Sequence, residues 1–329
     1  MVRFGYALSS EEHRSNDLVR HARLAEEAGF EFAMISDHYH PWVDAQGHSP
    51  FVWSVLGAIA RETERIEVGT GVTCPIIRIH PAIIAQAAAT TAEMFEGRFI
   101  LGIGTGENLN EHILGDGWPR YAIRREMLVE AMDIMRGLWE GELFSHDGAH
   151  YDVDNARLYS LPDEPPPIMI AASGHESATL AGELGDGLIT VGPNAEVIDE
   201  FRRAGGAGKP IYAQATICWA TSEDAAKRLL LETWPNAGVP GDLSQELPLP
   251  MHFEQAAKLV TAEQLAESIP SGPDLERHVD SLRKFIDGGI DNLYIHQVGP
   301  DQEGFLRFWR EELQPALAGI GQPAAVGSS

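Results

Sequence analysis

Short runs rich in β-branched and aromatic residues alternate with longer amphipathic runs along nearly the whole chain. The expected strands are residues 4–8, 32–35, 66–72, 99–103, 168–171, 187–190, 211–219 and 293–296. Helical spacing of apolar residues covers 17–28, 81–95, 124–139 and 302–317. Repeated strand–helix units predict an α/β fold with a parallel sheet. A count of about eight strands favours a closed (β/α)8 TIM barrel, with a doubly wound sheet as the alternative.

No linker interrupts this alternation. We therefore expect one barrel oxidoreductase domain over residues 1–320 and a disordered tail of small and polar residues over 321–329. Two segments exceed the simple alternation. Residues 142–159 predict a small hairpin, and residues 233–271 are rich in Pro and Gly at first and helical later. Long insertions on barrel loops commonly form lids or substrate walls.

The charge balance restricts the partners of the chain. It has 49 acidic and 24 basic residues, a formal charge of -25, and the acidic residues are spread along the sequence. Nucleic acids and anionic membranes require basic patches, so neither is expected as a partner. The two cysteines, Cys74 and Cys218, form no disulfide framework, and the N-terminus lacks the pattern of a signal peptide. We therefore expect a cytoplasmic protein that acts on a small molecule.

Polar and glycine residues replace the apolar pattern at one end of several expected strands. These segments are residues 36–42, 71–75, 102–110, 172–174 and 296–297. The C-terminal ends of all barrel strands meet at one face, where barrel enzymes place their active sites. The sequence therefore predicts one shared site built from these segments. His296, at the end of the last strand, is expected to line it on the substrate side.

The Asp37-His38 pair suits proton transfer, because imidazole titrates near neutrality and a neighbouring carboxylate can tune it. The alternative is a capped turn in which Asp37 serves the next helix. The strand-end position and the nearby Trp42 favour a functional role. His38-x-His40 could also bind a metal, as in barrel hydrolases, but the later strand ends supply no further ligands of the usual kind. We therefore expect no metal.

The glycine-rich segment Gly102-x-Gly104-x-Gly106-Glu107 indicates close approach of a cofactor to the backbone. It lacks the G-x-G-x-x-G spacing of a dinucleotide-binding unit. Ser173-Gly174 precedes an expected helix, whose N-terminus could bind an anion or could simply be capped by Ser173. Each motif alone leaves the choice between function and structure open.

Taken in order, the motifs resemble those of the luciferase-like flavin and deazaflavin oxidoreductases. Within them the chain is most similar to the coenzyme F420-dependent glucose-6-phosphate dehydrogenase branch, from about Phe4 to about Leu317. The motifs that carry the resemblance are Ser36-Asp37-His38, Pro41-Trp42, Gly69-Thr70-Gly71-Val72, Pro81-Ala82-x-x-Ala85-Gln86, Gly102 to Asn110, Ala171-Ala172-x-Gly174 and Gly185-Asp186-Gly187. The resemblance implies a TIM barrel that binds F420 at the strand C-termini, as a homodimer.

The resemblance also implies roles for individual residues. The catalytic group comprises His38, Glu107, Trp42 and Glu11. Cofactor contacts fall on Asp37, Gly71, Val72, Cys74, Asn110, Ser173, Gly174, Glu176 and Ser177, with a non-proline cis bond expected at Gly71-Val72. His38 would take the proton of a substrate hydroxyl while hydride leaves the same carbon, and Glu107 would exchange the proton at the deazaflavin N1. The two proton roles could also be exchanged.

The substrate positions depart from the family pattern. The family's threonine and first lysine correspond to Val191 and Asn194, and its second lysine corresponds to Gln255. Cys74 likewise replaces a cofactor-contacting threonine. A dianionic phosphate would lose charge-assisted hydrogen bonds without these lysines. The sequence therefore predicts F420-dependent hydride transfer at a hydroxyl-bearing carbon of a sugar, sugar phosphate or alcohol, or its reverse, and it disfavours glucose 6-phosphate as the main substrate.

Three alternatives to this function remain open. The first is an FMN-dependent luciferase-like monooxygenase, which shares the barrel but uses dioxygen. The second is a barrel that binds a ligand without catalysis, against which the retention of both His38 and Glu107 argues. The third is the metal-dependent hydrolase considered for His38-x-His40.

Overall fold

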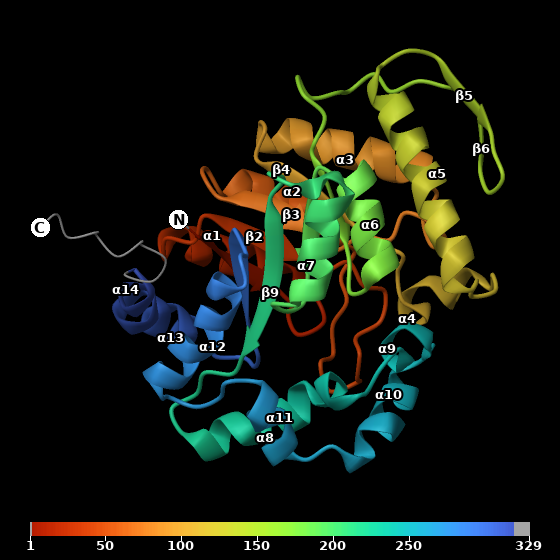
Figure 1. The fold of residues 1–329 in the computed structure, drawn as a ribbon. Coiled ribbons are helices and arrows are strands. Elements are labelled where there is room, and N and C mark those ends of the chain that lie inside the picture. Colours follow the sequence, from red (N-terminus) through yellow and green to blue (C-terminus); the bar gives the residue numbers. More distant parts are fainter. Residues whose placement is uncertain (1, 319–329) are drawn as a thin grey trace, which may run out of the picture.

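Eight parallel strands close into a barrel with helices around it in the computed structural model, which describes residues 2–318 (Figure 1). The expected tail over 321–329 lies outside the described residues. Around the barrel the strands follow one another in chain order, and β10 pairs with β1 to close it. They are β1 (Arg3–Leu8), β2 (Phe32–Ile35), β3 (Glu67–Thr70), β4 (Phe99–Ile103), β7 (Ile168–Ala171), β8 (Gly187–Thr190), β9 (Ile211–Ile217) and β10 (Asn292–Gln297).

The (β/α)8 barrel is confirmed, and all eight expected strands are present. The doubly wound alternative is wrong, because an open sheet would leave two edges where β1 and β10 are paired. The third and seventh strands are shorter than expected. β3 ends at Thr70, directly before the cis peptide bond at Gly71-Val72, and β9 ends at Ile217.

Helices cover the outside of the barrel. The principal ones are α1 (Ser15–Glu27), α2 (Val52–Glu62), α3 (Pro81–Phe95), α5 (Tyr121–Trp139), α6 (His175–Leu184), α7 (Ala195–Phe201), α8 (Glu223–Thr233), α12 (Leu275–Asp287), α13 (Gln302–Phe308) and α14 (Gln314–Leu317). The expected helix over 302–317 is divided by a π-helical turn at Trp309–Leu313. Within residues 2–318 no helix is long and apolar enough to cross a membrane.

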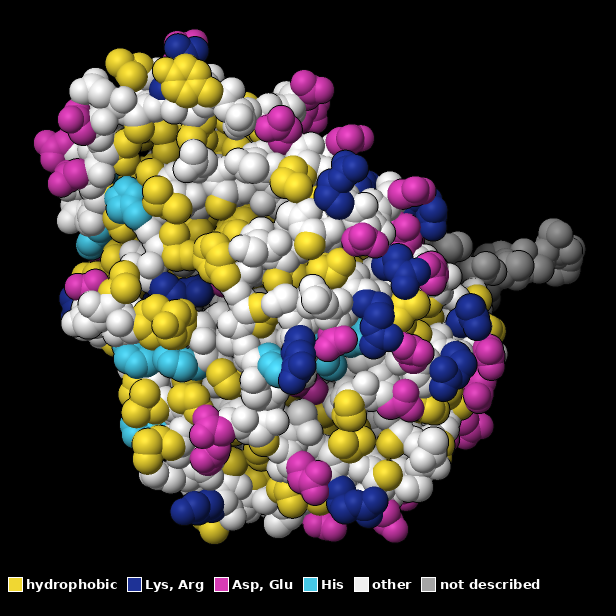
Figure 2. Space-filling model, turned by 180° about the vertical axis from the view of Figure 1, so that it is seen from behind, with side chains coloured by type: hydrophobic (Ala, Val, Ile, Leu, Met, Phe, Trp, Pro, Cys, Tyr) yellow, Lys and Arg dark blue, Asp and Glu magenta, His cyan; other side chains and the backbone are white. Residues whose placement is uncertain are grey.

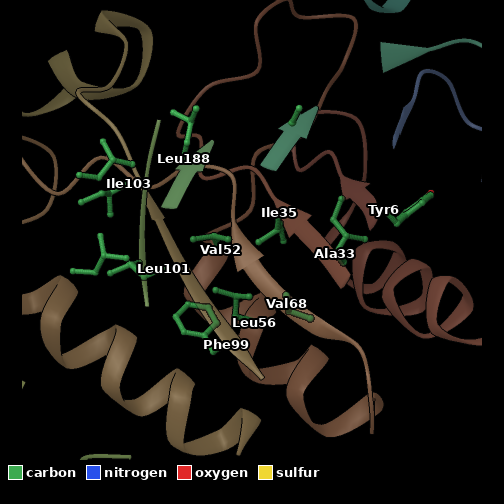
Figure 3. Packing of buried hydrophobic residues seen from close by; sticks show 14 of the residues in the cluster. Tyr6, Ala33, Ile35, Val52, Leu56, Val68, Phe99, Leu101, Ile103 and Leu188 are labelled. Carbon is green, nitrogen blue, oxygen red and sulfur yellow. The ribbon is translucent and has the colours of Figure 1, made fainter. Parts of the chain in front are cut away.

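The main core lies between the strands and the surrounding helices. Figure 3 shows Ile35, Val68 and Phe99 of the strands beside Val52 and Leu56 of α2. A second cluster fills the interior of the barrel, with Phe32, Met34, Ile100, Met169, Ile189, Tyr212 and Tyr294. Burial on both faces explains why the strands read as continuous apolar runs rather than alternating ones.

Two excursions leave the barrel pattern, as expected. The first is an antiparallel hairpin of β5 (Phe144–Asp147) and β6 (Asp152–Ala156), and the second is the segment 233–271, called the insertion from here on. The hairpin lies far from the insertion in Figure 1. The insertion contains α9 (Leu243–Glu246), α10 (Pro250–Ala256) and α11 (Ala262–Ser268), which lie with α8 along the bottom of that view. Figure 2 shows acidic and basic side chains interspersed over one face of the molecule.

Candidate active site

A cavity of about 670 Å³ opens at the C-terminal ends of the barrel strands and extends beneath the insertion. This volume suits a cofactor or drug-sized ligand. All eight barrel strands, or the loops that follow them, contribute residues to it, although these segments lie far apart in sequence, as a barrel site requires. The predicted site residues that line it are Glu11, His38, Trp42, Gly71, Val72, Glu107, Ser173, Ser177, Val191 and His296.

The other predicted residues lie beside the cavity or away from its lining. Asp37, Cys74 and Asn110 are buried and do not line the cavity. Exposed Glu176 forms an ion pair with Arg125 at 3.1 Å between Oε2 and Nη1. Gly174 is the N-cap of α6, Asn194 caps α7 by accepting from the backbone N–H of Glu196, and Gln255 is an exposed residue of α10.

Glu11 and His38 form a buried pair at the cavity wall. Glu11 Oε1 lies 3.3 Å from His38 Nε2, and both side chains are nearly inaccessible to solvent. The hydroxyls of Ser36 and Ser9 donate to Glu11 Oε2 at 2.6 and 3.0 Å. Burial would raise the pKa of Glu11, but the charge of His38 and these hydrogen bonds hold it below its ordinary value. Glu11 is therefore an ionised partner for His38.

The remaining contacts of His38 fix its ring. Nδ1 lies 3.2 Å from the carbonyl oxygen of His40, which can only accept a hydrogen bond. In the neutral ring, donation from Nδ1 leaves Nε2 without a hydrogen, so Nε2 can accept a proton; in the imidazolium that results, Nε2 faces the Glu11 carboxylate as a donor. The Trp42 ring packs edge-on against the imidazole, with 4.9 Å between ring centroids. This arrangement can accept a proton from a ligand hydroxyl and stabilise the imidazolium that forms.

A second glutamate–histidine pair lies at the same face. His296 Nε2 lies 2.7 Å from Glu12 Oε1, and the backbone N–H of Gly299 donates to Glu12 Oε2 at 2.9 Å. The Trp234 ring, at the start of the insertion, packs 4.4 Å from the His296 ring. Sequence reasoning missed Glu12 and Trp234. The doubled glutamate after the first strand was the available signal for Glu12.

Asn110 connects the loop after β2 to the loop after β4. Its Oδ1 accepts from the backbone N–H groups of Tyr39 and His40 at 2.9 and 3.2 Å, and its Nδ2 donates to Glu107 Oε2 at 3.4 Å. Asn110 belongs to α4 (Asn108–Glu111), the short helix that Glu107 directly precedes. The hydrogen bonds of its amide therefore hold Glu107 in place relative to the loop after β2.

At its floor and at one end, the cavity presents backbone atoms to a ligand rather than side chains. The peptide bond between Gly71 and Val72 is cis, as the family resemblance implied. Gly106 has φ 73° and lies so close to Cys74 that an added Cβ would be 2.5 Å from its Sγ. Gly174, at the start of α6, has no side chain to accept from the first-turn N–H groups, which leaves them available to an anion.

The insertion forms the opposite wall with mixed polarity. It contributes Trp234, Asn236, Gln245 and Phe253, and Phe253 packs against Trp42 with 5.2 Å between ring centroids. No lysine or arginine occurs among the described residues that line the cavity. Over residues 2–318, no group of three or more His, Cys, Asp or Glu side chains is placed to hold a metal ion.

Comparisons with known proteins agree with this architecture. A family model described as luciferase-like monooxygenase matches residues 1–292. An F420-dependent glucose-6-phosphate dehydrogenase of Microbacterium testaceum is 35% identical over 328 residues, covering 96% of this chain and 97% of that protein. An F420-dependent hydroxymycolic acid dehydrogenase of Mycobacterium tuberculosis is 37% identical over 320 residues, covering 95% of this chain and 88% of that protein.

A solved structure is similar over nearly the same span. It is an F420-dependent secondary alcohol dehydrogenase in complex with an F420–acetone adduct, with a TM-score of 0.87 and 30% identity over 94% of this chain and 97% of that one. The chain therefore belongs to the luciferase-like family, on the branch of the F420-dependent dehydrogenases.

Proposed function

We propose that this chain is an F420-dependent dehydrogenase that oxidises a neutral alcohol at its hydroxyl-bearing carbon, or catalyses the reverse reaction. The observation that carries the proposal is the placement of the Glu11–His38 pair and Glu107 on one cavity that has no lysine or arginine in its described lining. The relatives named above act with F420, and their substrates carry hydroxyl groups.

The residues present fit the cofactor. The cavity floor at Gly71-Val72, with Met34 and Ile189, offers an apolar platform for a tricyclic ring. Ser173, Ser177 and the uncapped N-terminus of α6 would hold the phosphate end, because helix N-termini bind anions. Cys74, Asp37 and Asn110 would support the ring site from behind its wall. When bound, F420 supplies a two-electron acceptor for the hydride of the carbinol carbon.

The protein supplies proton transfer and orientation. His38 Nε2 would take the hydroxyl proton of the substrate, and Glu11 would stabilise the resulting imidazolium. Glu107 lines the same cavity from the β4 side and would exchange a proton with the ring. Trp42 and Phe253 would exclude water from the substrate side, and His296 would contact the substrate from β10.

The charge of the lining favours an uncharged substrate. Three carboxylates line the cavity, those of Glu11, Glu107 and Asp242, and a phosphate dianion placed among them would be repelled. Val191 is 74% exposed and apolar, and Asn194 already caps α7, so neither replaces a lysine. Gln255 is uncharged, so it does not replace a lysine either. A sugar phosphate is therefore disfavoured relative to a secondary alcohol.

The same proposal includes a homodimer that works in the cytoplasm. Leu143 and Tyr159, beside the β5–β6 hairpin, are 65% and 86% exposed, which is consistent with a contact surface. Buried Cys74 and Cys218 are both unpaired, consistent with a reducing compartment. Light scattering during size exclusion measures the mass directly, and a monomer at micromolar concentration would contradict the dimer.

The experiment that tests the function follows F420 absorbance with purified protein. We expect reduction of F420 by small secondary alcohols and none by glucose 6-phosphate, with His38→Ala retaining F420 binding and losing turnover. Titration with FMN is the comparison for the monooxygenase alternative. Tight FMN binding without F420 binding, or full turnover by the His38→Ala variant, would overturn the proposal.

A further inference from the structure

A single arginine connects the two loops that carry the proposed proton-transfer groups. Arg78 lies between β3 and α3, and its side chain is 6% exposed, between those of Asp37 at 0% and Glu111 at 1%. Its Nη2 donates to Asp37 Oδ1 at 2.8 Å, and its backbone N–H donates to Glu111 Oε2 at 2.8 Å. Its Nε lies 3.5 Å from Glu111 Oε1.

Each carboxylate is joined to one of the proposed catalytic residues. Asp37 directly precedes His38, and its Oδ2 also accepts from the hydroxyl of Thr73 at 2.8 Å. The backbone N–H of Glu111 donates to the carbonyl oxygen of Glu107 at 3.2 Å within the α4 turn. A movement of Arg78 would therefore act on both His38 and Glu107, although Arg78 itself does not line the cavity.

Burial and charge together explain why the Asp37 and Glu111 carboxylates need the positive charge of Arg78. Burial raises the pKa of Glu111 to about 7, although Arg78 acts in the opposite direction. The charges of Asp37 and Glu111 raise the pKa of Arg78 against the effect of its own burial. Removal of the guanidinium would leave a buried carboxylate at Asp37 without a positive partner, which proteins relieve by protonation or by movement of the loop.

We propose that Arg78 is a positioning residue that sets the placement of His38 relative to Glu107 for hydride transfer. The inference rests on the proposed function, since it assigns the catalytic groups that are positioned. The guanidinium is suited to this task because its planar fork can engage two carboxylates at once, whereas an ammonium group is a single point charge. A misplacement of about 1 Å at such a site costs on the order of a hundredfold in rate.

Two variants of Arg78 and one matched control test the proposal. Arg78→Gln removes the charge, and Arg78→Lys keeps it without the fork. Arg98→Gln is the control, because Arg98 also joins two segments, through the carbonyl oxygens of Ile66 and Thr63, but lies at the opposite end of the barrel. Each protein is compared with the wild type for melting temperature, F420 binding, and kcat and KM with a secondary alcohol and its carbinol-deuterated form.

We expect Arg78→Gln to lower kcat by roughly tenfold to a hundredfold, with F420 affinity and KM changed by less than about threefold. The deuterium isotope effect on kcat should rise, because hydride transfer becomes slower relative to product release. Arg78→Lys should lie between Arg78→Gln and the wild type. Arg98→Gln should lose thermal stability and keep both kcat and the isotope effect.

A readout without turnover separates this inference from the proposed function. Hydrogen exchange should show lost protection in residues 36–42 and 105–112 of Arg78→Gln, and not in Arg98→Gln. That pattern supports the positioning role even where no substrate has been found. Wild-type kcat in a folded Arg78→Gln protein, or unchanged exchange in both segments, would overturn it.

Discussion

Glu11 and Glu12 are consecutive in the chain, and their carboxylates contact two different histidines on the two sides of β1. Glu11 Oε1 lies 3.3 Å from Nε2 of His38, which follows β2. Glu12 Oε1 lies 2.7 Å from Nε2 of His296, which belongs to β10. β1 pairs with both β2 and β10, so the geometry follows from barrel closure. Two oriented imidazoles thus line one cavity, from the loop after β2 and from β10, on the two sides of β1.

Glu11→Gln should lower kcat by on the order of tenfold to a hundredfold and leave F420 binding unchanged. The difference in kcat should shrink at low pH, because protonation of Glu11 removes the same negative charge that the substitution removes. Stopped-flow measurement of F420 reduction at several pH values checks both effects. Glu12→Gln is the matched control, and an identical loss of kcat in that variant would contradict the specific role of Glu11.

His296→Leu should raise KM for the alcohol by about tenfold while kcat changes little, because the proposed function gives the residue a contact with the substrate and no role in proton transfer. The variant also leaves the Glu12 carboxylate buried with only the N–H of Gly299. The double variant Glu12→Gln/His296→Leu should therefore recover stability but not KM. A fall in kcat at unchanged KM would show that His296 acts in the chemical step instead.

The strands and the barrel were predictable because the hydrophobic pattern of each segment is visible in its own residues. The eight strands lie within a few residues of the positions expected from apolar runs, and His38, Glu107 and Trp42 all line the cavity. Their placement follows from the rule that barrel sites gather at the strand C-termini. Their chemical roles stay predictions.

Contacts between loops were not predictable from the sequence. Arg78 and Glu111 carried no motif, and only the closed barrel brings them beside Asp37. Asp37 and Asn110 were expected at the cofactor, yet their side chains are engaged by other loops. Asn194 corresponds to a substrate-binding lysine of the family, but in this chain its side chain caps α7. The resemblance alone did not predict this capping role.

Glu111→Gln should change how stability depends on pH. The pKa of Glu111 is raised in the folded state to about 7, so its contribution to stability is fully present below its ordinary value and is lost as pH rises through about 7. The wild type should therefore lose up to about 3 kcal/mol relative to the variant between about pH 5 and pH 8. Urea unfolding across this range measures the difference.

The exposed Glu142 supplies the control for that experiment. Glu142→Gln should give unfolding curves that stay parallel to the wild type at every pH. A constant difference between the wild type and Glu111→Gln would mean that Glu111 titrates alike in the folded and unfolded states, contrary to its burial against Arg78.

Gly106→Ala should destabilise the fold by about 2 kcal/mol and lower kcat, because the residue directly precedes Glu107. Its φ is 73°, and an added Cβ would lie 2.5 Å from Cys74 Sγ and 3.1 Å from Glu111 Cγ. Gly115 also has a positive φ, 88°, but no atom lies within 4 Å of its added Cβ. Gly115→Ala should therefore cost only about 1 kcal/mol, from backbone conformation alone.

The clash at Gly106 can be separated from the backbone effect by a double-mutant cycle with Cys74→Ala. Removal of the sulfur atom makes room for the new methyl group, so the double variant should be less destabilised than the sum of the two single variants. Thermal or urea unfolding gives the coupling free energy, which we expect to be about 1 kcal/mol. Additive effects would show that the methyl group is accommodated elsewhere, and that Gly106 is required for its positive φ rather than for the approach of Cys74.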